Sequence, residues 1–382
     1  MKNDTKSAVK KAVAFNSYFN AAFYNILSMR SLKEMVIICD EASKDDSIAD
    51  ITWLKTLRHD IEDGKRRFYT TDCNFSNSHI YGIWYSLFGD LKQKPLLTPS
   101  VEHGLIFHNQ LFNDVEDTAR AACVTFGAFR KSIIRQYTNI PIFCVGPYIH
   151  YATSFYDEQR LATEKKKNGK TLLVFPMHST NNSELSVEIN NYRDYLKSKQ
   201  KEFDTILINT FWWNINDPLC MVLQSDGYRI VSAGFRDDIM FMSRLKSLIR
   251  LADLVVGDSI GTHVGYCIDC GVPFSYEPLG SKNVSLLEKE IKDADFVETH
   301  VNKIAKAFYR TDTITDEQRV LCDYYWGQDK IRTKNEIRTI AALTEEIMRK
   351  SSGYKAKFRD CAEWMLQEIN EEERRLLQES LE

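Results

Sequence analysis

The 382-residue sequence has no hydrophobic run long enough to cross a membrane. A transmembrane helix needs about 20 consecutive apolar residues, and every apolar segment here is interrupted well before that length. The amino-terminal segment also lacks the form of a secretory signal peptide. We therefore expect a cytoplasmic protein that touches a membrane only peripherally, at the inner face of the plasma membrane.

An excess of charge of one sign is also missing. The 50 Lys and Arg residues are nearly balanced by 53 Asp and Glu residues, which leaves a formal net charge of −3. Binding to the phosphate backbone of nucleic acid depends on a clustered excess of basic side chains. The composition thus predicts no nucleic-acid partner.

Cysteine spacing of the kind that binds metal is absent as well. Nine cysteines occur at irregular intervals, mostly within apolar runs. Cys267 and Cys270 have the CxxC spacing, but the sequence supplies no second pair and no set of histidines nearby, as a zinc site would need. We interpret the cysteines as buried thiols of a reducing compartment.

The most informative stretch that is present covers residues 252–278. Leu254 to Val256 form an apolar run typical of a buried strand, and a second such run begins at Pro273. A small polar turn and a helix-like segment, 263–270, lie between them. Open α/β sheets bind ligands at the carboxyl ends of their strands, and the start of a helix favours phosphate. We therefore predict a phosphate or ribose site in this turn, and an ordinary α/β turn is the alternative. The predicted residues are Asp258, Ser259, Gly261, Thr262 and His263.

Apolar runs alternate with amphipathic segments over residues 35–147. The runs predict strands at 35–40, 66–72, 95–104, 122–127 and 141–147, and the amphipathic segments predict helices at 51–61, 80–91 and 128–137. Such alternation is typical of a parallel sheet covered on both faces. We assign residues 1–150 to a first Rossmann-like domain. Its leading segment, residues 1–30, is basic and aromatic. It fits either a helix packed on this domain or one that lies on an anionic membrane surface.

A second alternation follows a break in the pattern. Residues 151–170 lose the apolar period and end in a basic run, as a linker would. Strands are predicted at 171–176, 204–213, 228–234, 254–256 and from 273, with helices near 187–199, 218–224 and 240–250. We assign residues 171–311 to a second doubly wound domain. Strand signals cease after Pro278, and residues 312–382 read as a charged helical tail that packs on the first domain or on a partner.

The sequence predicts two Rossmann-like halves joined by a linker. The turn that most resembles a ligand-binding turn lies late in the second half. The chain resembles the GT-B glycosyltransferases, most closely the bacterial capsule and lipopolysaccharide biosynthesis proteins of that fold. Four motifs carry the resemblance: SVEHG at 100–104, VGPYIH at 145–150, FPMHST at 175–180 and GDSIGTHVGY at 257–266. The resemblance implies an α/β fold with two doubly wound domains facing a cleft. In that family the nucleotide-sugar donor sits on the second domain, and the glycan or lipid-linked glycan acceptor enters from the first.

Residues of the first domain are expected on the acceptor side. Sugar transfer with inversion needs a group that takes the proton from the acceptor hydroxyl. His103, and after it Glu102, follow a strand-like segment where similar enzymes often carry such a base. A histidine that bonds only local backbone is the alternative. Gly104, Gly127 and Arg130 are expected near the acceptor, with Arg130 pairing to an acidic group or, alternatively, lying on the surface.

Residues of the second domain are expected to hold the donor. His178, Ser179 and Thr180 follow its first strand, where imidazole and hydroxyl donors stabilise charge on the departing phosphate. Helix capping is the alternative for the hydroxyls. Base and ribose contacts are expected at the ends of later strands, at Gly234, Arg236 and Glu277.

Signatures of other sugar transferases do not stand out. The Asp-Asp pairs at 45–46 and 237–238 lack the Asp-x-Asp form of metal-dependent enzymes, and residues 252–280 lack the Glu-x7-Glu pair of many retaining GT-B enzymes. The resemblance therefore implies an inverting transferase without metal or cofactor. It would move a sugar from a nucleotide-sugar onto a surface polysaccharide or lipopolysaccharide, as a homo-oligomer or within an assembly complex.

Three other functions fit the same architecture. A nucleotide-sugar 2-epimerase would release epimerised or free sugar without an acceptor. A polyol-phosphate transferase of the teichoic-acid type would consume CDP-glycerol. A non-catalytic scaffold of a polysaccharide-assembly complex would bind a partner protein and no nucleotide.

Overall fold

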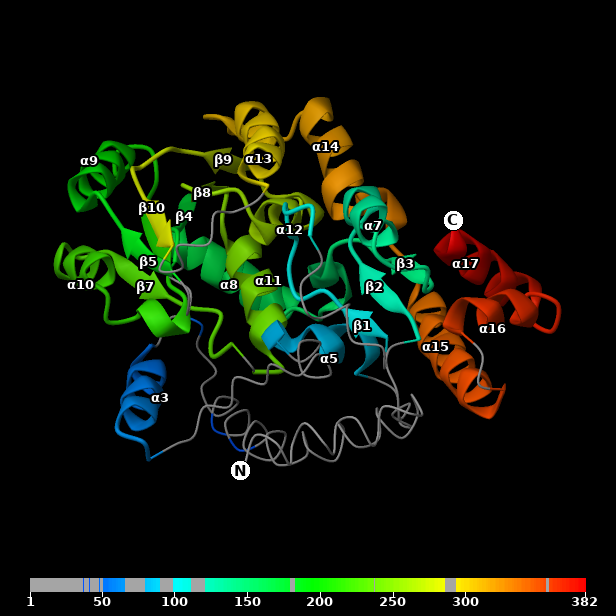
Figure 1. Cartoon of the computed structure of the whole chain (residues 1–382). Coiled ribbons are helices and arrows are strands. Elements are labelled where there is room, and N and C mark those ends of the chain that lie inside the picture. Colours follow the sequence, from blue (N-terminus) through cyan, green and yellow to red (C-terminus); the bar gives the residue numbers. More distant parts are fainter. Residues whose placement is uncertain are drawn as a thin grey trace, which may run out of the picture.

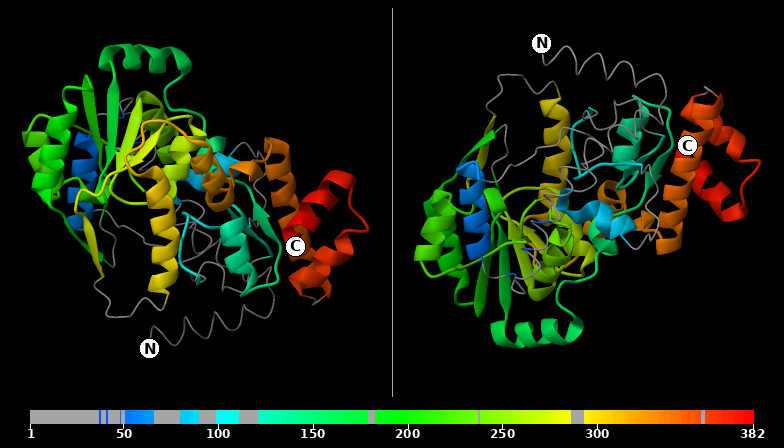
Figure 2. Two further views of the ribbon diagram at one scale, coloured as in Figure 1. Left: turned by 90° about the horizontal axis from the view of Figure 1, so that it is seen from above. Right: turned by 90° about the horizontal axis from the view of Figure 1, so that it is seen from below.

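The computed structural model of the protein describes residues 37, 41, 48, 51–65, 80–89, 99–110, 121–178, 183–236, 238–285, 293–354 and 357–382. These residues form an α/β structure with two parallel sheets (Figure 1). Seen from above, the five-stranded sheet and the last two helices lie at opposite ends of the molecule (Figure 2). None of the described helices has both the length and the apolar character needed to cross a bilayer.

The larger sheet has five parallel strands in the order β7-β6-β4-β8-β9. They are β4 (Thr171–Phe175), β6 (Thr205–Asn209), β7 (Arg229–Val231), β8 (Leu254–Gly257) and β9 (Phe274–Tyr276). The chain starts at the central β4, runs outward to β7 and returns to β8, as in a doubly wound sheet. Side chains alternate along β4, so Leu173 enters the core on one face and Leu172 the core on the other. Burial on both faces explains the nearly continuous apolar runs.

Helices cover both faces of this sheet. The core of one face contains residues of α9 (Ile189–Lys199), α10 (Pro218–Ser225) and α3 (Thr52–Glu62). The core of the other face contains residues of α11 (Phe241–Leu251) and α12 (Thr262–Asp269). The helices and strands predicted between 187 and 276 are thus confirmed, as is the helix predicted at 51–61.

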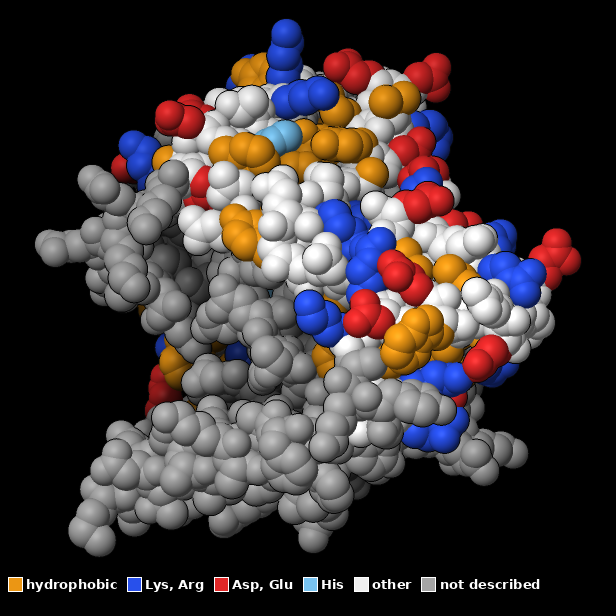
Figure 3. Space-filling model, turned by 45° about the vertical axis from the view of Figure 1, so that its right-hand side comes forward, with side chains coloured by type: hydrophobic (Ala, Val, Ile, Leu, Met, Phe, Trp, Pro, Cys, Tyr) orange, Lys and Arg blue, Asp and Glu red, His pale blue; other side chains and the backbone are white. Residues whose placement is uncertain are grey.

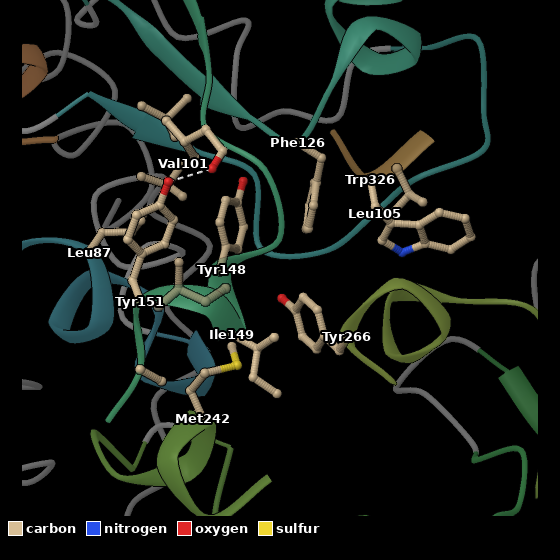
Figure 4. Packing of buried hydrophobic residues seen from close by; sticks show 14 of the residues in the cluster. Leu87, Val101, Leu105, Phe126, Tyr148, Ile149, Tyr151, Met242, Tyr266 and Trp326 are labelled. Atoms are coloured by element: carbon tan, nitrogen blue, oxygen red, sulfur yellow. Dashed lines mark hydrogen bonds between the residues drawn. The ribbon is translucent and has the colours of Figure 1, made fainter. Parts of the chain in front are cut away.

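The smaller sheet consists of β1 (Ser100–Val101), β2 (Cys123–Thr125) and β3 (Ile142–Cys144), which are parallel and adjacent in that order. Helix α7 (Ala128–Arg135) packs on β3, and the single turn η2 (Tyr148–Tyr151) contacts the short helix α5 (Ile83–Phe88), which follows the turn η1 (Ile80–Gly82). One apolar core joins the two sheets, since it contains Val124 as well as Val255. The rings of Tyr148 and Tyr266 lie within this shared core (Figure 4).

The segment predicted as a linker is largely helical. α8 (Glu158–Asn168) occupies most of it. Its N-terminus is capped by Asp157, whose carboxylate accepts the Arg160 N–H at 2.7 Å, and its last turn is basic and followed by Gly169 with φ of 65°. Caps and the helix dipole stabilise a helix without an apolar stripe, which explains why apolar periodicity failed to indicate it.

Two further predictions of strands need correction. A strand does occur after Pro278: β10 (Lys282–Ser285) pairs antiparallel with β5 (Ser183–Ser186). Both are short and polar, so they lack the apolar alternation on which the prediction relied. Within the strand predicted at 35–40, the described residue Ile37 is helical and half exposed, so that prediction is wrong there. The strand predicted at 66–72 and the segment 1–30 lie outside the described residues.

The carboxyl-terminal segment is helical, as predicted. It consists of α13 (Ala294–Phe308), α14 (Asp316–Trp326), η4 (Gln328–Lys330), α15 (Lys334–Tyr354), α16 (Phe358–Met365) and α17 (Glu371–Leu381). α17 returns to the smaller sheet, where Lys131 and Arg135 of α7 donate to the carbonyls of Glu379 and Ser380. The end of the chain therefore packs against α7, beside the smaller sheet.

Candidate functional site

The carboxyl ends of β4 and β8 lie side by side in the middle of the larger sheet. Phe175 and Gly257 are paired across the two strands, so the segments that follow them begin at the same edge. These segments lead to helices on opposite faces of the sheet, α9 after β4 and α12 after β8. Open α/β sheets bind ligands at such a switch point. The motifs at 175–180 and 257–263 therefore begin at one place, although Ser179 and Thr180 themselves lie outside the described residues.

Asp258 ties the segments around this switch point together. It is buried, and its Oδ1 accepts the N–H of Met177 at 2.8 Å. Its Oδ2 accepts a short hydrogen bond from the hydroxyl of Tyr192, which also lies 3.1 Å from the Ser281 Oγ. The carboxylate is thus shared between the loop after β4 and helix α9. Its observed contacts fit a residue that positions the switch-point loops.

His263 is the second residue of α12 and is held as a neutral ring. It stacks on Phe175 with a centroid distance of 5.3 Å and packs edge-on against Phe274. Burial lowers its pKa to about 4, with a smaller contribution from nearby His178. Gly257 and Gly261 border the ring, and a Cβ on either would come within 3.3 Å of a ring nitrogen. Gly257 and Gly261 therefore make room for the imidazole.

His178 connects the switch point to a cavity beside it. Its ring lies 4.8 Å from that of Phe211, centroid to centroid. The side chain keeps a solvent-exposed face, while protein surrounds its other sides and lowers its pKa below the ordinary value. A neutral imidazole offers one N–H donor and one acceptor, so His178 suits hydrogen bonding to a ligand at neutral pH, whereas the Nε2 of His263 is buried.

The start of α12 contacts the loop after β1. The Thr262 Oγ1 accepts the N–H of Leu105 at 2.8 Å, and a Cβ on Gly104 would lie 3.2 Å from the same oxygen. On its other side, Trp326 of α14 donates its ring N–H to the Thr262 carbonyl at 3.1 Å. His103 is half-buried in this loop. The structure therefore brings two predicted motifs, 102–104 and 257–263, together across the two sheets.

Glu102 and Arg130 are buried and paired with each other. The Arg130 Nη2 donates to the Glu102 Oε1 at 2.6 Å, and Thr125 donates its hydroxyl to the Oε2 at 2.5 Å. Arg130 also donates to the carbonyls of Ile106 and His108, at 3.3 and 2.8 Å. Neither charge faces a ligand in this arrangement. Both residues instead hold the loop that carries His103.

Two backbone segments approach each other closely at Gly127. A Cβ at this position would lie 2.7 Å from the Cα of Gly327, just after α14. The start of α7, where an acceptor contact was expected, is therefore covered by the end of α14.

The residues expected at base and ribose are far apart. Gly234 and Arg236 follow β7 and Glu277 follows β9, which are the two edges of the larger sheet. Four strand spacings of about 4.8 Å separate these strand ends by roughly 19 Å, so one nucleoside cannot contact both. Gly234 has φ of 108° and the Arg236 carbonyl accepts the N–H of Tyr81. Glu277 is buried and pairs with Arg310 at 3.2 Å.

One Asp-x-Asp sequence is present after all, at 293–295, at the start of α13. Asp293 is buried and engaged: its Oδ1 lies 3.1 Å from the His108 Nδ1, and its Oδ2 accepts the N–H of Asn109 at 2.7 Å. This carboxylate anchors the loop after β1 to α13. Across the described ranges, no group of three His, Cys, Asp or Glu side chains is arranged to hold a metal ion.

Sequence reasoning missed a cavity of about 270 Å³ at the carboxyl ends of β4 and β6. Its walls come from the loops after these strands and from the starts of α9 and α10. His178 is the only predicted site residue among them. Asn209, Thr210 and Phe211 follow the apolar residues 206–208 within the segment 204–213, and these polar and aromatic residues at a strand end were the available signal. The lining residues are Pro176, Met177, His178, Val187, Ile189, Ile208, Asn209, Thr210, Phe211, Asn214, Asp217, Pro218, Leu219 and Cys220.

Comparison with known proteins adds no family. No protein-family model matches the chain, and no curated protein has a significantly similar sequence.

Proposed function

We propose that the protein is a glycosyltransferase of GT-B type that moves a sugar from a nucleotide-sugar onto a growing surface polysaccharide or lipopolysaccharide. The observation that carries the proposal is the contact between the loop after β1 and the start of α12, where the Leu105 N–H meets the Thr262 hydroxyl at 2.8 Å. A transferase must hold two substrates at one point. This contact joins the segment expected to serve the acceptor to the segment expected to serve the donor.

The donor phosphates would lie at the first turn of α12. Within the described part of the chain no side chain caps this helix, and its first amides and dipole favour negative charge. His178 would donate an N–H group to the phosphates and stabilise the charge on the departing nucleotide. Because burial lowers the pKa of its ring, it would do so as a neutral donor. His263, whose Nε2 is buried, would act by holding the first turn of α12 against Phe175.

The acceptor would approach from the loop after β1. His103 would take the proton from the acceptor hydroxyl as the sugar is transferred with inversion. Glu102 and Arg130 would act through the position of the loop, since they are buried and bonded to each other. Residues 1–150 would form the acceptor domain and residues 171–311 the donor domain, in a cytoplasmic enzyme that needs no metal.

The proposal is tested by sugar transfer with the full chain, a panel of nucleotide-sugars and a lipid-linked or capsular glycan acceptor, followed by mass spectrometry. In His103→Ala we expect the transfer rate to fall about 10²- to 10⁴-fold, because a general base contributes that much, while donor affinity stays unchanged. His150→Ala is the matched control. His150 is an exposed histidine that pairs with Asp269 at the far end of α12, and we expect near-normal transfer.

Four results would contradict the proposal in different ways. Near-normal transfer by His103→Ala would reject the base. Release of epimerised sugar without acceptor would indicate the 2-epimerase, and consumption of CDP-glycerol would indicate the polyol-phosphate transferase. Absence of nucleotide binding together with stable binding of a partner protein would indicate the scaffold.

A further inference from the structure

We propose that the cavity at the ends of β4 and β6 receives the base of the donor nucleotide, and that it selects bases with an exocyclic amino group over uracil. The inference rests on the proposed function, because it assumes that the bound ligand is a nucleotide. The sequence pattern placed the nucleoside at the edge strands of the larger sheet. The inference places it at β4 and β6, beside the switch point.

The interior of the cavity suits a flat heterocycle. Its volume is about 270 Å³, and apolar side chains of Ile189, Ile208 and Leu219 are among its walls. Phe211 adds an aromatic ring on which a base can stack. A free phosphate or a bare sugar would leave hydroxyls or charges without partners against such walls, which is unfavourable. The wall composition thus favours an aromatic base.

The polar side chains of the walls include one carboxylate, that of Asp217. The carboxylate of Asp217 can only accept, and it receives one N–H from Asn214 while its other oxygen lies 3.8 Å from Arg58. An amino group of cytosine, adenine or guanine would donate to this carboxylate, whereas the 4-oxo group of uracil would oppose it.

The cavity lies beside the switch point of the larger sheet. His178 lines it, lies 4.8 Å from Phe211, and is near enough to His263 to influence its pKa. A nucleotide with its base in the cavity would therefore pass its phosphates beside His178 toward the start of α12. The sugar would then lie toward the loop that carries His103. By contrast, a base at β7 and a ribose at β9 would be separated by the width of the sheet.

Paired ligands test the inference directly on the full chain. CDP and UDP differ at position 4, where one has an amino and the other an oxo group, and at N3, which is an acceptor in cytosine and an N–H donor in uracil. GDP differs from IDP by one amino group. Binding is followed by calorimetry and by the fluorescence of Trp212 and Trp213, which adjoin Phe211 in the chain. We expect CDP to bind about tenfold more tightly than UDP, the effect of roughly one charge-assisted hydrogen bond, and GDP to exceed IDP similarly.

Variants then locate the site. Phe211→Ala should weaken CDP binding about tenfold or more, through lost stacking. Asp217→Asn keeps the shape of the side chain but removes the carboxylate. The ratio of CDP to UDP affinity should therefore fall toward one. A merely structural role of Asp217 would not change this ratio. Met221→Ala, on the exposed face of α10, is the control and should leave both affinities unchanged. Thermal unfolding confirms that each variant is folded.

Glu277→Gln distinguishes a nucleoside bound at β9 from one bound in the cavity at β4 and β6. If the nucleoside lies at β9, this variant will weaken CDP binding and Phe211→Ala will not, which overturns the inference. Equal affinity of the wild type for CDP and UDP, or a Phe211→Ala effect on free monosaccharide alone, would also overturn it. In either case observed sugar transfer would leave the proposed function intact. The expected preference for CDP without any transfer would support the cavity assignment and reject the transferase.

Discussion

His263 shows how burial can set the charge of a single residue. Protein surrounds its ring, which stacks on Phe175, and the pKa falls from the ordinary 6.5 to about 4. The unfolded chain takes up this proton near pH 6.5, but the folded chain takes it up only near pH 4. The unfolded state therefore binds more protons between these values, and folded stability falls as the pH drops through this window. Above pH 7 the residue is neutral in both states and adds no pH dependence.

His263→Phe tests this at the residue scale. The variant keeps an aromatic ring against Phe175 but has no proton to take up. We expect the free energy of unfolding of the wild type to fall by up to roughly 3 kcal/mol more than that of the variant between pH 7 and pH 4. Urea unfolding at a series of pH values measures the difference. Parallel curves for the two proteins would contradict the low pKa.

At the scale of elements, a buried ion pair joins β1, β2 and α7 to the loop that carries His103. Glu102 is bonded by Thr125 and Arg130, and Arg130 donates further to two loop carbonyls. Leaving one member of a buried pair alone is more destabilising than replacing both, because the remaining charge has no partner. The pair therefore stabilises the position of the loop more than it stabilises the fold as a whole.

Arg130→Met should lower the free energy of unfolding by about 3–5 kcal/mol, whereas the double variant Glu102→Leu, Arg130→Met should lose clearly less. Urea unfolding gives both values. Hydrogen exchange at 106–110 should become faster in the single variant, because those carbonyls lose their donor. Equal losses in the single and double variants would show that the two residues are not coupled. If the Arg130→Met variant lost affinity for acidic acceptors at unchanged stability, Arg130 would bind the acceptor, as the sequence predicted.

At the scale of the whole molecule, the end of the chain completes the smaller sheet. α17 buries Leu376 and Leu377 and accepts hydrogen bonds from Lys131 and Arg135 of α7. On the face shown in Figure 3, basic and acidic side chains are interspersed, in keeping with a net charge of −3. Apolar contact, rather than a long-range electric field, therefore attaches the helices to the sheet.

A chain that stops after residue 369 should lose about 6 kcal/mol of stability, since each buried leucine contributes roughly 2 kcal/mol and Leu376, Leu377 and Leu381 are removed. Thermal unfolding and dye binding to exposed apolar surface measure the effect. The matched control is Arg375→Ala, which removes only a half-exposed cation that pairs with Glu336 and Glu379. It should change stability by less than about 1 kcal/mol. An unchanged melting temperature in the truncated chain would show that α17 is not part of the fold.

Local pattern determined most of the elements. The apolar run at 254–256 and the helix at 263–270 appear where the residues predict them, because periodicity in a short segment reports which of its faces is buried. The same pattern did not indicate α8, which depends on caps and charge, or β5 and β10, which are short and mostly polar in sequence.

Only the tertiary structure decided which residues meet. The order β7-β6-β4-β8-β9 places Gly234 and Glu277 at opposite edges of the sheet and brings His178 and His263 together in its middle. The fold also pairs Glu102 with Arg130. A sequence pattern can show that a charge is near the end of a strand, but not which partner lies opposite it. That partner depends on the order in which the strands pair, and the pairing is set by packing of the whole core.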